Sequence, residues 1–333
     1  MISAGKHSVQ KWFSTLNGIL DKTMPLLTPV GVSAGYLFPD AFIILKPYVP
    51  VLFGFMTLSG ALKLRFSQMK ETIKNPLPIL IFFITAHIIM PGLALLLGSI
   101  WNPLDHEITA GFILLFAIPT AVSGFIWNSI FSGHGALSLS LILFDTLLAP
   151  FLVPFTVTQL LGTAVHIDSR GMMLSLSGMV VVPTIIGVWL NELSQGRIPA
   201  RTSPLLGVFS KLFLLLVIAA NTSAVAPKVD LFQKSLWIIA LQGIFLSLVG
   251  FLLGKIAGIV GKCETPVERT LVFSVGLRNI SAAATLAIAF FPEKAAVPAI
   301  LGMIFQQTLA AISGRVLLGS PDNIRQQQDK NLL

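Results

Sequence analysis

Two charged side chains interrupt long apolar stretches of this sequence, and their types are suited to chemistry there. Arg278 and Asp145 each lie among apolar residues. A guanidinium recognises carboxylates and sulfonates through paired hydrogen bonds. A carboxylate in an apolar setting carries a proton or balances a positive charge. We therefore expect Arg278 to bind an anionic substrate and to meet Asp145, which serves as coupling group or counter-ion. A buried ion pair that only fixes packing is the alternative.

Several uncharged polar residues lie near these charges. Asn279 and Ser281 closely follow Arg278, and Thr120 and Ser123 lie in a second polar interruption. Their hydroxyl and amide groups donate or accept hydrogen bonds, so we expect these four residues to contact substrate.

His87 also lies in an apolar stretch. An imidazole titrates near neutral pH, which makes this residue a second candidate coupling group. A histidine that only bonds to a neighbouring helix is the alternative.

Other kinds of chemistry lack their sequence signatures here. The five histidines are scattered without the spacing of metal ligands, and the chain has no zinc-protease motif, phosphate loop or nucleophile–base pair. Cys263 is the only cysteine, so no disulfide forms within the chain. The net charge of +8 comes without a basic stripe of interleaved aromatic residues, which argues against nucleic-acid binding. We expect no enzymatic activity, no resident metal and no cofactor beyond a coupling ion, Na+ or H+.

The elements that must position these residues are membrane-spanning helices. Of the 333 residues, 54% are hydrophobic and only 11% are charged, whereas soluble domains are about a quarter charged. A spanning helix needs roughly 20 mostly apolar residues. The sequence therefore predicts an all-α membrane protein with about ten spans. The predicted spans cover residues 24–38, 48–64, 77–98, 108–131, 136–161, 172–190, 204–222, 236–260, 271–291 and 297–318.

Short connections join these spans, so we expect residues 24–318 to form a single membrane domain. Residues 1–23 and 319–333 are then terminal segments. Lys and Arg gather in the connections on the same side as both termini, and positive charge marks the cytoplasmic side. We expect both termini in the cytoplasm and the protein in a bacterial inner membrane, in contact with lipid. The sequence does not indicate an oligomeric state.

The predicted spans also contain an internal repeat. Residues 119–124 (Pro-Thr-Ala-Val-Ser-Gly) interrupt the fourth span, and residues 276–281 (Gly-Leu-Arg-Asn-Ile-Ser) interrupt the ninth. These are the fourth elements of two five-span halves, and an odd number of spans gives the halves opposite orientations. Interrupted helices at matching positions of inverted halves indicate the binding site of a secondary transporter, although proline and glycine are common in membrane helices anyway. We expect the two interruptions to cross near mid-membrane.

The sequence resembles the bile acid:sodium symporters from about Met24 to Leu318. The motifs that carry this resemblance follow one another in order along the chain. They are Phe38-Pro39-Asp40, Pro47-Tyr48-Val49-Pro50, Met90-Pro91, Pro119, Ala136-Leu137-Ser138, Leu147-Leu148-Ala149-Pro150, Val275-Gly276 and Asn279-Ile280-Ser281. Each motif alone is common, and their order and spacing make the resemblance specific.

The resemblance implies a ten-helix fold with an inverted five-helix repeat. Spans 1, 2, 6 and 7 would form a panel domain, and spans 3–5 and 8–10 a core domain. It also implies alternating access, organic-anion substrates such as bile acids or small carboxylates, and coupling to two sodium ions. Among the sodium-ligand positions that the resemblance carries over, Ser138 and Ser274 keep a side-chain oxygen.

Two departures from the family pattern argue against sodium. Ser274 stands where the family has an acidic residue, and Arg278 stands where it has a glutamine. Hard cations prefer several oxygen ligands, and a guanidinium within the site repels them. We therefore expect a transporter in which Arg278 is a built-in cation and coupling uses protons at Asp145 or His87, or is absent. A sodium-coupled symporter and a passive anion channel or uniporter are the alternatives.

Overall fold

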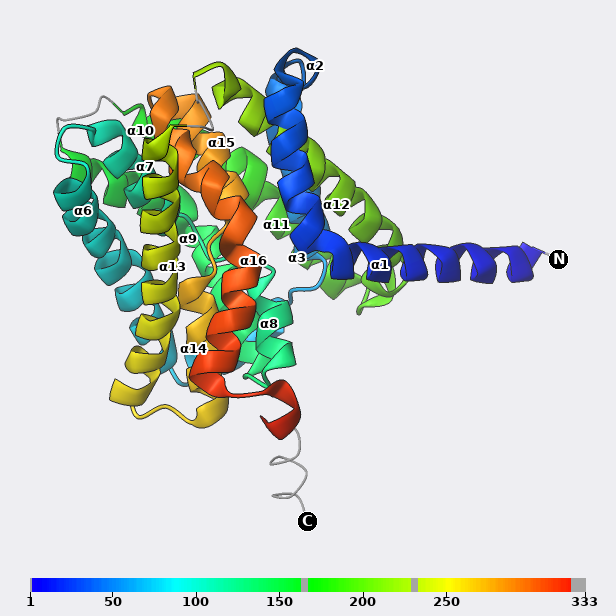
Figure 1. Ribbon diagram of the computed structural model, residues 1–333. Coiled ribbons are helices and arrows are strands. Elements are labelled where there is room, and N and C mark those ends of the chain that lie inside the picture. Colours follow the sequence, from blue (N-terminus) through cyan, green and yellow to red (C-terminus); the bar gives the residue numbers. More distant parts are fainter. Residues whose placement is uncertain (1, 163–166, 229–232, 325–333) are drawn as a thin grey trace. The chain divides into compact units, whose positions relative to one another are not determined.

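The computed structural model describes residues 2–162, 167–228 and 233–324 (Figure 1). Every regular element in these ranges is a helix, and the β-type contact that they contain is an isolated bridge. The chain divides into two compact units. Unit 1 comprises residues 1–66 and 174–229, and unit 2 comprises residues 67–173 and 230–333.

Unit 1 is built around two long helices, α1 and α12. In it α1 lies along α12, and α3 packs on both α11 and α12. Gly35 of α1 lies so close to the backbone of Ala219 in α12 that a Cβ would overlap it, so only glycine fits at this contact. The elements are α1 (Ile2–Leu37), α2 (Pro39–Ile43), the 3-10 turn η1 (Lys46–Tyr48), α3 (Val49–Ala61), the π turn η3 (Ser177–Val181), α11 (Val182–Leu193), α12 (Arg197–Val225) and η4 (Ala226–Lys228).

Unit 2 contains the remaining helices. In it α13 runs beside α14 and α16, as Figure 1 shows, and α6 packs on α7. The elements are α4 (Phe66–Ile73, whose first residue belongs to unit 1), α5 (Leu77–Ile84), the π turn η2 (Thr85–Ile89), α6 (Met90–Trp101), α7 (His106–Ala117), α8 (Gly124–Ile130), α9 (Gly135–Leu161), α10 (Ser169–Leu176, which continues into unit 1), α13 (Lys234–Val260), α14 (Thr265–Gly276), α15 (Ile280–Phe290), the 3-10 turn η5 (Glu293–Ala296) and α16 (Val297–Leu318).

Seven stretches of the described chain are long and apolar enough to cross a membrane. They are Pro39–Ala61, Leu77–Trp101, Gly135–Leu161, Ser169–Leu193, Arg197–Val225, Lys234–Val260 and Glu293–Leu318. Three shorter apolar helices lie at Leu26–Leu37, His106–Ala117 and Ile280–Phe290. The predicted all-α membrane protein is confirmed, whereas the count of ten spans stays a prediction.

Some predicted boundaries differ from the observed ones. The helix that contains the first predicted span begins at Ile2, and its apolar part, Leu26–Leu37, lies within the predicted residues 24–38. The second span begins at Pro39, nine residues before its predicted start, since Pro39 occupies the first turn of a helix, where proline is tolerated. Most of the predicted C-terminal segment, residues 325–333, lies outside the described residues.

Two π turns lie directly before prolines. In η2 the N–H of Met90 bonds to the carbonyl of Thr85, five residues earlier, and Pro91 follows. The next carbonyl in the series, that of Ala86, would need an N–H from Pro91, which proline lacks. The π turn and the proline together therefore leave the Ala86 carbonyl free to accept a hydrogen bond from elsewhere in the fold.

Candidate functional site

The candidate site is formed where two interrupted helices of unit 2 meet. The first interruption separates α7 from α8: α7 ends at Ala117 and Ile118 is extended. The second separates α14 from α15: Leu277 is extended, and the Asn279 side chain caps α15 by accepting a hydrogen bond from the N–H of Ala282 (3.4 Å). With about 1.5 Å per residue, the 12 residues of α7 and the 11 of α15 are too short to cross a hydrocarbon core of about 30 Å.

The two interruptions bond to each other. The N–H of Ala121 donates to the Leu277 carbonyl (3.1 Å), and the N–H of Asn279 donates to the Pro119 carbonyl (2.9 Å). These bonds enclose an antiparallel bridge between Thr120 and Arg278. Unwound backbone within a membrane must find partners in protein, and here each interruption supplies the partners of the other. The predicted crossing of two broken helices is confirmed.

Close packing holds the second interruption in place. Gly276 is the last residue of α14, and a Cβ at this position would overlap the ring of Phe251 on α13. The ring of Phe251 is fully buried and stands edge-on to Phe273. Only glycine therefore allows α14 to end this close to α13.

Arg278 is buried at the crossing, with 2% of its surface exposed. Its Nη2 donates to the carbonyl of Ala86 (3.0 Å), which the π turn leaves free, and to the carbonyl of Phe116 at the end of α7 (2.6 Å). Its Nε and Nη1 have no hydrogen-bond partner. The Arg278 carbonyl accepts from Gln306 Nε2 (2.6 Å). The guanidinium is thus fixed by one nitrogen, while its other donors remain unused.

Asp145 contacts a different set of groups from the one we expected. It is fully buried on α9; its Oδ2 accepts from the backbone N–H of Thr120 (2.7 Å), and its Oδ1 lies 2.7 Å from His87 Nε2. The His87 contact is an ion-pair approach whose atoms are not aligned for a linear hydrogen bond. Arg278 and Asp145 form no direct hydrogen bond or ion pair: Arg278 Nη2 contacts the carbonyls of Ala86 and Phe116, and Asp145 contacts Thr120 and His87. Thr120 links them, since it bridges to the Arg278 backbone and donates to Asp145.

The other residues predicted to bind substrate lie at the edges of the crossing. Ser123 comes directly before α8 and its Oγ accepts weakly from Gln307 Nε2 (3.5 Å). Ser281 is in the first turn of α15. The Thr120 hydroxyl donates to the Leu277 carbonyl (3.0 Å) and is therefore already used within the protein. Ser138 and Ser274, the predicted sodium positions, are buried on α9 and α14.

Sequence reasoning missed the acceptors that hold the guanidinium. Every residue has a carbonyl, so no residue type marks Ala86 or Phe116, and only the proline five residues after Ala86 signals a freed acceptor. Among the described residues no group of three or more His, Cys, Asp or Glu is placed to hold a metal ion.

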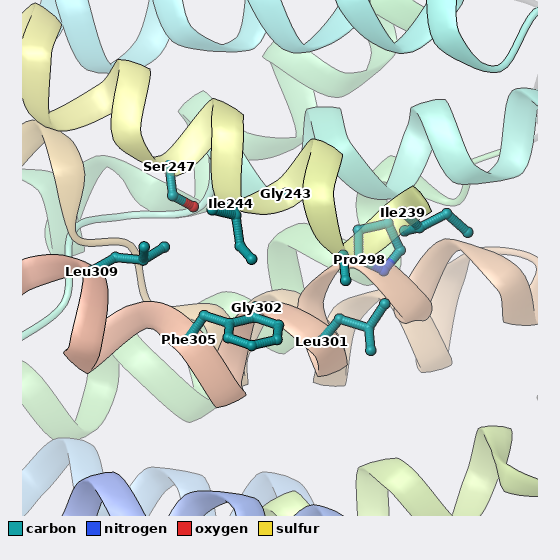
Figure 2. A pocket seen from close by; sticks show the side chains of 10 residues that line it. Ile239, Gly243, Ile244, Ser247, Pro298, Leu301, Gly302, Phe305 and Leu309 are labelled. Atoms are coloured by element: carbon teal, nitrogen blue, oxygen red, sulfur yellow. The ribbon is translucent and has the colours of Figure 1, made fainter. Parts of the chain in front are cut away.

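A separate crevice lies between α13 and α16. Figure 2 shows Ile244 and Phe305 beside it, among apolar neighbours with Ser247 at one end. Its volume is about 10 Å³, about enough for a single water molecule. The residues that line it carry no charge, so this crevice is unsuited to an organic anion.

The sequence profile of the sodium bile acid symporter family matches residues 50–229. YbaS of Bacillus subtilis is 38% identical to this chain over 294 residues, covering 88% of the chain and 96% of YbaS. This chain belongs to the sodium bile acid symporter family. It is a secondary transporter of the membrane and not an enzyme.

More distant family members carry functional names. YocS of Bacillus subtilis, described as a sodium-dependent transporter, is 25% identical over 85% of each chain. BASS1 of Oryza sativa, described as a probable sodium/metabolite cotransporter of the chloroplast, is 25% identical over 87% of this chain and 70% of its own length. The solved structure of the sodium proton antiporter MjNhaP1 from Methanocaldococcus jannaschii matches 96% of this chain and 98% of its own, with a TM-score of 0.57 and 15% identity. That match shows a shared fold.

Proposed function

We propose that this protein moves an organic anion, a bile-acid-like compound or a small carboxylate, across the membrane by alternating access. Arg278 supplies a fixed positive charge that takes the place of the sodium ions implied by the family resemblance. One observation carries this proposal: a guanidinium that is 2% exposed keeps its Nε and Nη1 without acceptors. An unpaired buried donor costs about 1–3 kcal/mol, and more when it is charged. A carboxylate or sulfonate would satisfy these donors.

Two groups near Arg278 add negative potential at its guanidinium. The Phe116 carbonyl that it contacts lies at the C-terminal end of α7, where the helix dipole adds negative potential. The negative charge of Asp145 also attracts the guanidinium across the site. A mobile cation would be stabilised by the same field, and a tethered guanidinium removes the need for one.

The remaining substrate contacts come from the C-terminal side of the second interruption, where α15 begins, and from the first interruption. Asn279 Nδ2 and the Ser281 hydroxyl lie next to the start of α15, whose dipole favours an anion. Ser123 contributes from the first interruption, and Thr120 contributes when its hydroxyl exchanges the Leu277 carbonyl for the substrate. Because Arg278 is buried, the anion reaches it only after the surrounding helices move, which fits alternating access. We assign the panel role to unit 1 and the core role to unit 2, with both termini cytoplasmic and the protein in the plasma membrane.

The second candidate function is sodium-coupled symport. The relatives YocS and BASS1, described as a sodium-dependent transporter and a probable sodium/metabolite cotransporter, favour it. In this chain Ser138 and Ser274 are the side-chain oxygens that remain for it, and few hard oxygen ligands make a weak sodium site. A passive anion channel or uniporter is the third candidate.

The test uses purified protein in proteoliposomes. Thermal-shift screening with acetate, pyruvate and taurocholate identifies an anion that binds, and its labelled form is then followed under a sodium gradient, a pH gradient or neither. We expect uptake without sodium, and binding that is at least about tenfold weaker in Arg278→Gln, because one charge-assisted contact contributes about 1.5–3 kcal/mol. Arg65→Gln is the matched control, since Arg65 is exposed in unit 1. Strict sodium dependence would refute the fixed-cation mechanism.

A further inference from the structure

His87 and Asp145 form a buried pair beside the crossing, and one nitrogen of that pair has no partner. His87 Nε2 lies 2.7 Å from Asp145 Oδ1, and we assign the proton of a neutral imidazole to Nε2 because this nitrogen faces the carboxylate. His87 Nδ1 is buried and has no hydrogen-bond partner. The imidazole therefore has one vacant position for a second proton, and this position is closed off from the surface of unit 2.

Three neighbouring groups act on a positive charge at the His87 ring: Asp145 and Phe83 attract it, and Arg278 repels it. Asp145 offers a negative charge, and the ring of Phe83 stacks on the imidazole with centroids 5.5 Å apart, a geometry that attracts a cation. Arg278 opposes protonation because it is bonded to the carbonyl of Ala86, the residue before His87. Other titratable residues of the helices packed against η2 and α9 lie toward helix ends. They are His106 and Glu107 of α7, His134 before α9, Lys234 and Lys255 of α13, and Glu268 and Arg269 of α14.

We propose that His87 and Asp145 are the proton-binding site of the transporter, and that one proton binds for each negative charge bound at Arg278. The inference rests on the proposed function of Arg278. While His87 is neutral, the charges of Arg278 and Asp145 cancel. An anion bound alone leaves a net negative charge inside the membrane, which is costly. A proton on His87 Nδ1 restores neutrality, so the loaded site is an anion and a proton together.

The coupling follows from the position of Arg278. A bound anion cancels the repulsion between the guanidinium and the imidazolium, and so it strengthens proton binding. Binding linkage is reciprocal, so the proton strengthens anion binding by the same factor. Raising the pH removes the proton, and anion affinity then falls by up to about tenfold per pH unit for a single linked proton.

The first experiment needs no anion. Proton uptake by the full-length protein in detergent is titrated between about pH 5 and 8, the range in which an imidazole changes charge, and is compared with that of His87→Gln. We expect the wild type to take up about one proton more than His87→Gln over this pH range. His106→Gln is the matched control, because His106 is a histidine that is exposed in unit 2. In Asp145→Asn, which keeps the shape of the side chain, the His87 step moves to lower pH. A wild-type curve that coincides with His87→Gln overturns the proposal.

The second experiment adds acetate and taurocholate separately and measures their affinity by thermal shift across the same pH range. We expect the affinity to fall with pH in the wild type and in His106→Gln, and to be flat in His87→Gln. If binding depends on Arg278 but the pH profile is unchanged in His87→Gln, the proton site is wrong and the anion site stands. If Arg278→Gln binds as the wild type does, the proposed function fails, and the proton titration still decides the role of His87.

Discussion

Each unit contains a π turn directly before a proline, and the two turns differ in what they carry. In unit 2, η2 precedes Met90-Pro91 and carries His87, which contacts Asp145. In unit 1, η3 precedes Val182-Pro183, and its buried residues are the apolar Met179 and Val180. The irregular backbone has the same cause in both, a proline without an N–H. A π turn alone therefore does not form a binding site. The site in unit 2 depends on the polar side chains and the freed carbonyl beside the turn.

The arginines of the two units show the same contrast. Arg278 is buried with two carbonyl acceptors, whereas Arg65 is exposed beside an open hollow of about 400 Å³ in unit 1 that Lys63 and Asn191 also line. A solvated charge contributes little to stability. A buried charge interacts with every group to which it is hydrogen-bonded. Its removal therefore destabilises the whole crossing.

The largest effect that we expect from this contrast follows Arg278→Leu. The substitution leaves the carbonyls of Ala86 and Phe116 without their donor and removes the positive charge that faces Asp145. We expect the free energy of unfolding to fall by about 3 kcal/mol. Denaturant unfolding in detergent measures it, with Arg65→Leu expected to change it by less than about 0.5 kcal/mol. Equal losses in the two variants would show that burial does not separate the two arginines.

A smaller effect is expected at a glycine of the crossing. In Gly276→Ala the new methyl group meets the Phe251 ring, and overpacking of a buried contact costs about 1–3 kcal/mol. Gly178→Ala in η3 is the matched variant, because nothing lies within 4 Å of its Cβ position. We expect Gly276→Ala to melt at a lower temperature and Gly178→Ala to melt at or slightly above the wild-type value. A wild-type melting temperature in Gly276→Ala would mean that α14 does not need its close approach to α13.

The sequence predicted the backbone of the site better than its contacts. Pro119 and Gly276 mark the interruptions because proline lacks a donor and glycine permits close packing, and both act locally. The partner of Asp145 was not predictable in this way. It depends on the side-chain register that η2 gives His87, and on how α9 packs against a turn 58 residues earlier in the chain. We expected Arg278 there because opposite charges attract, but the freed carbonyl of Ala86 holds the guanidinium elsewhere.

The prolines after the two π turns give the subtlest test of the comparison. Pro91→Ala restores an N–H that can bond to the Ala86 carbonyl, so the new donor competes with Arg278 Nη2 for that acceptor. A relaxed helix also turns His87 away from Asp145. We expect the free energy of unfolding to change by less than about 1 kcal/mol, because one hydrogen bond replaces another. Anion affinity and its pH dependence should weaken by several-fold.

Pro183→Ala makes the same backbone change in unit 1, where the turn carries Met179 and Val180. We expect its anion affinity and pH profile to match the wild type, by the same thermal-shift measurement. Equal weakening in both variants would mean that the prolines act through general helix flexibility. Weakening in Pro91→Ala alone would show that anion binding depends on the groups that η2 carries, the freed Ala86 carbonyl and His87, and not on the bend that both turns share.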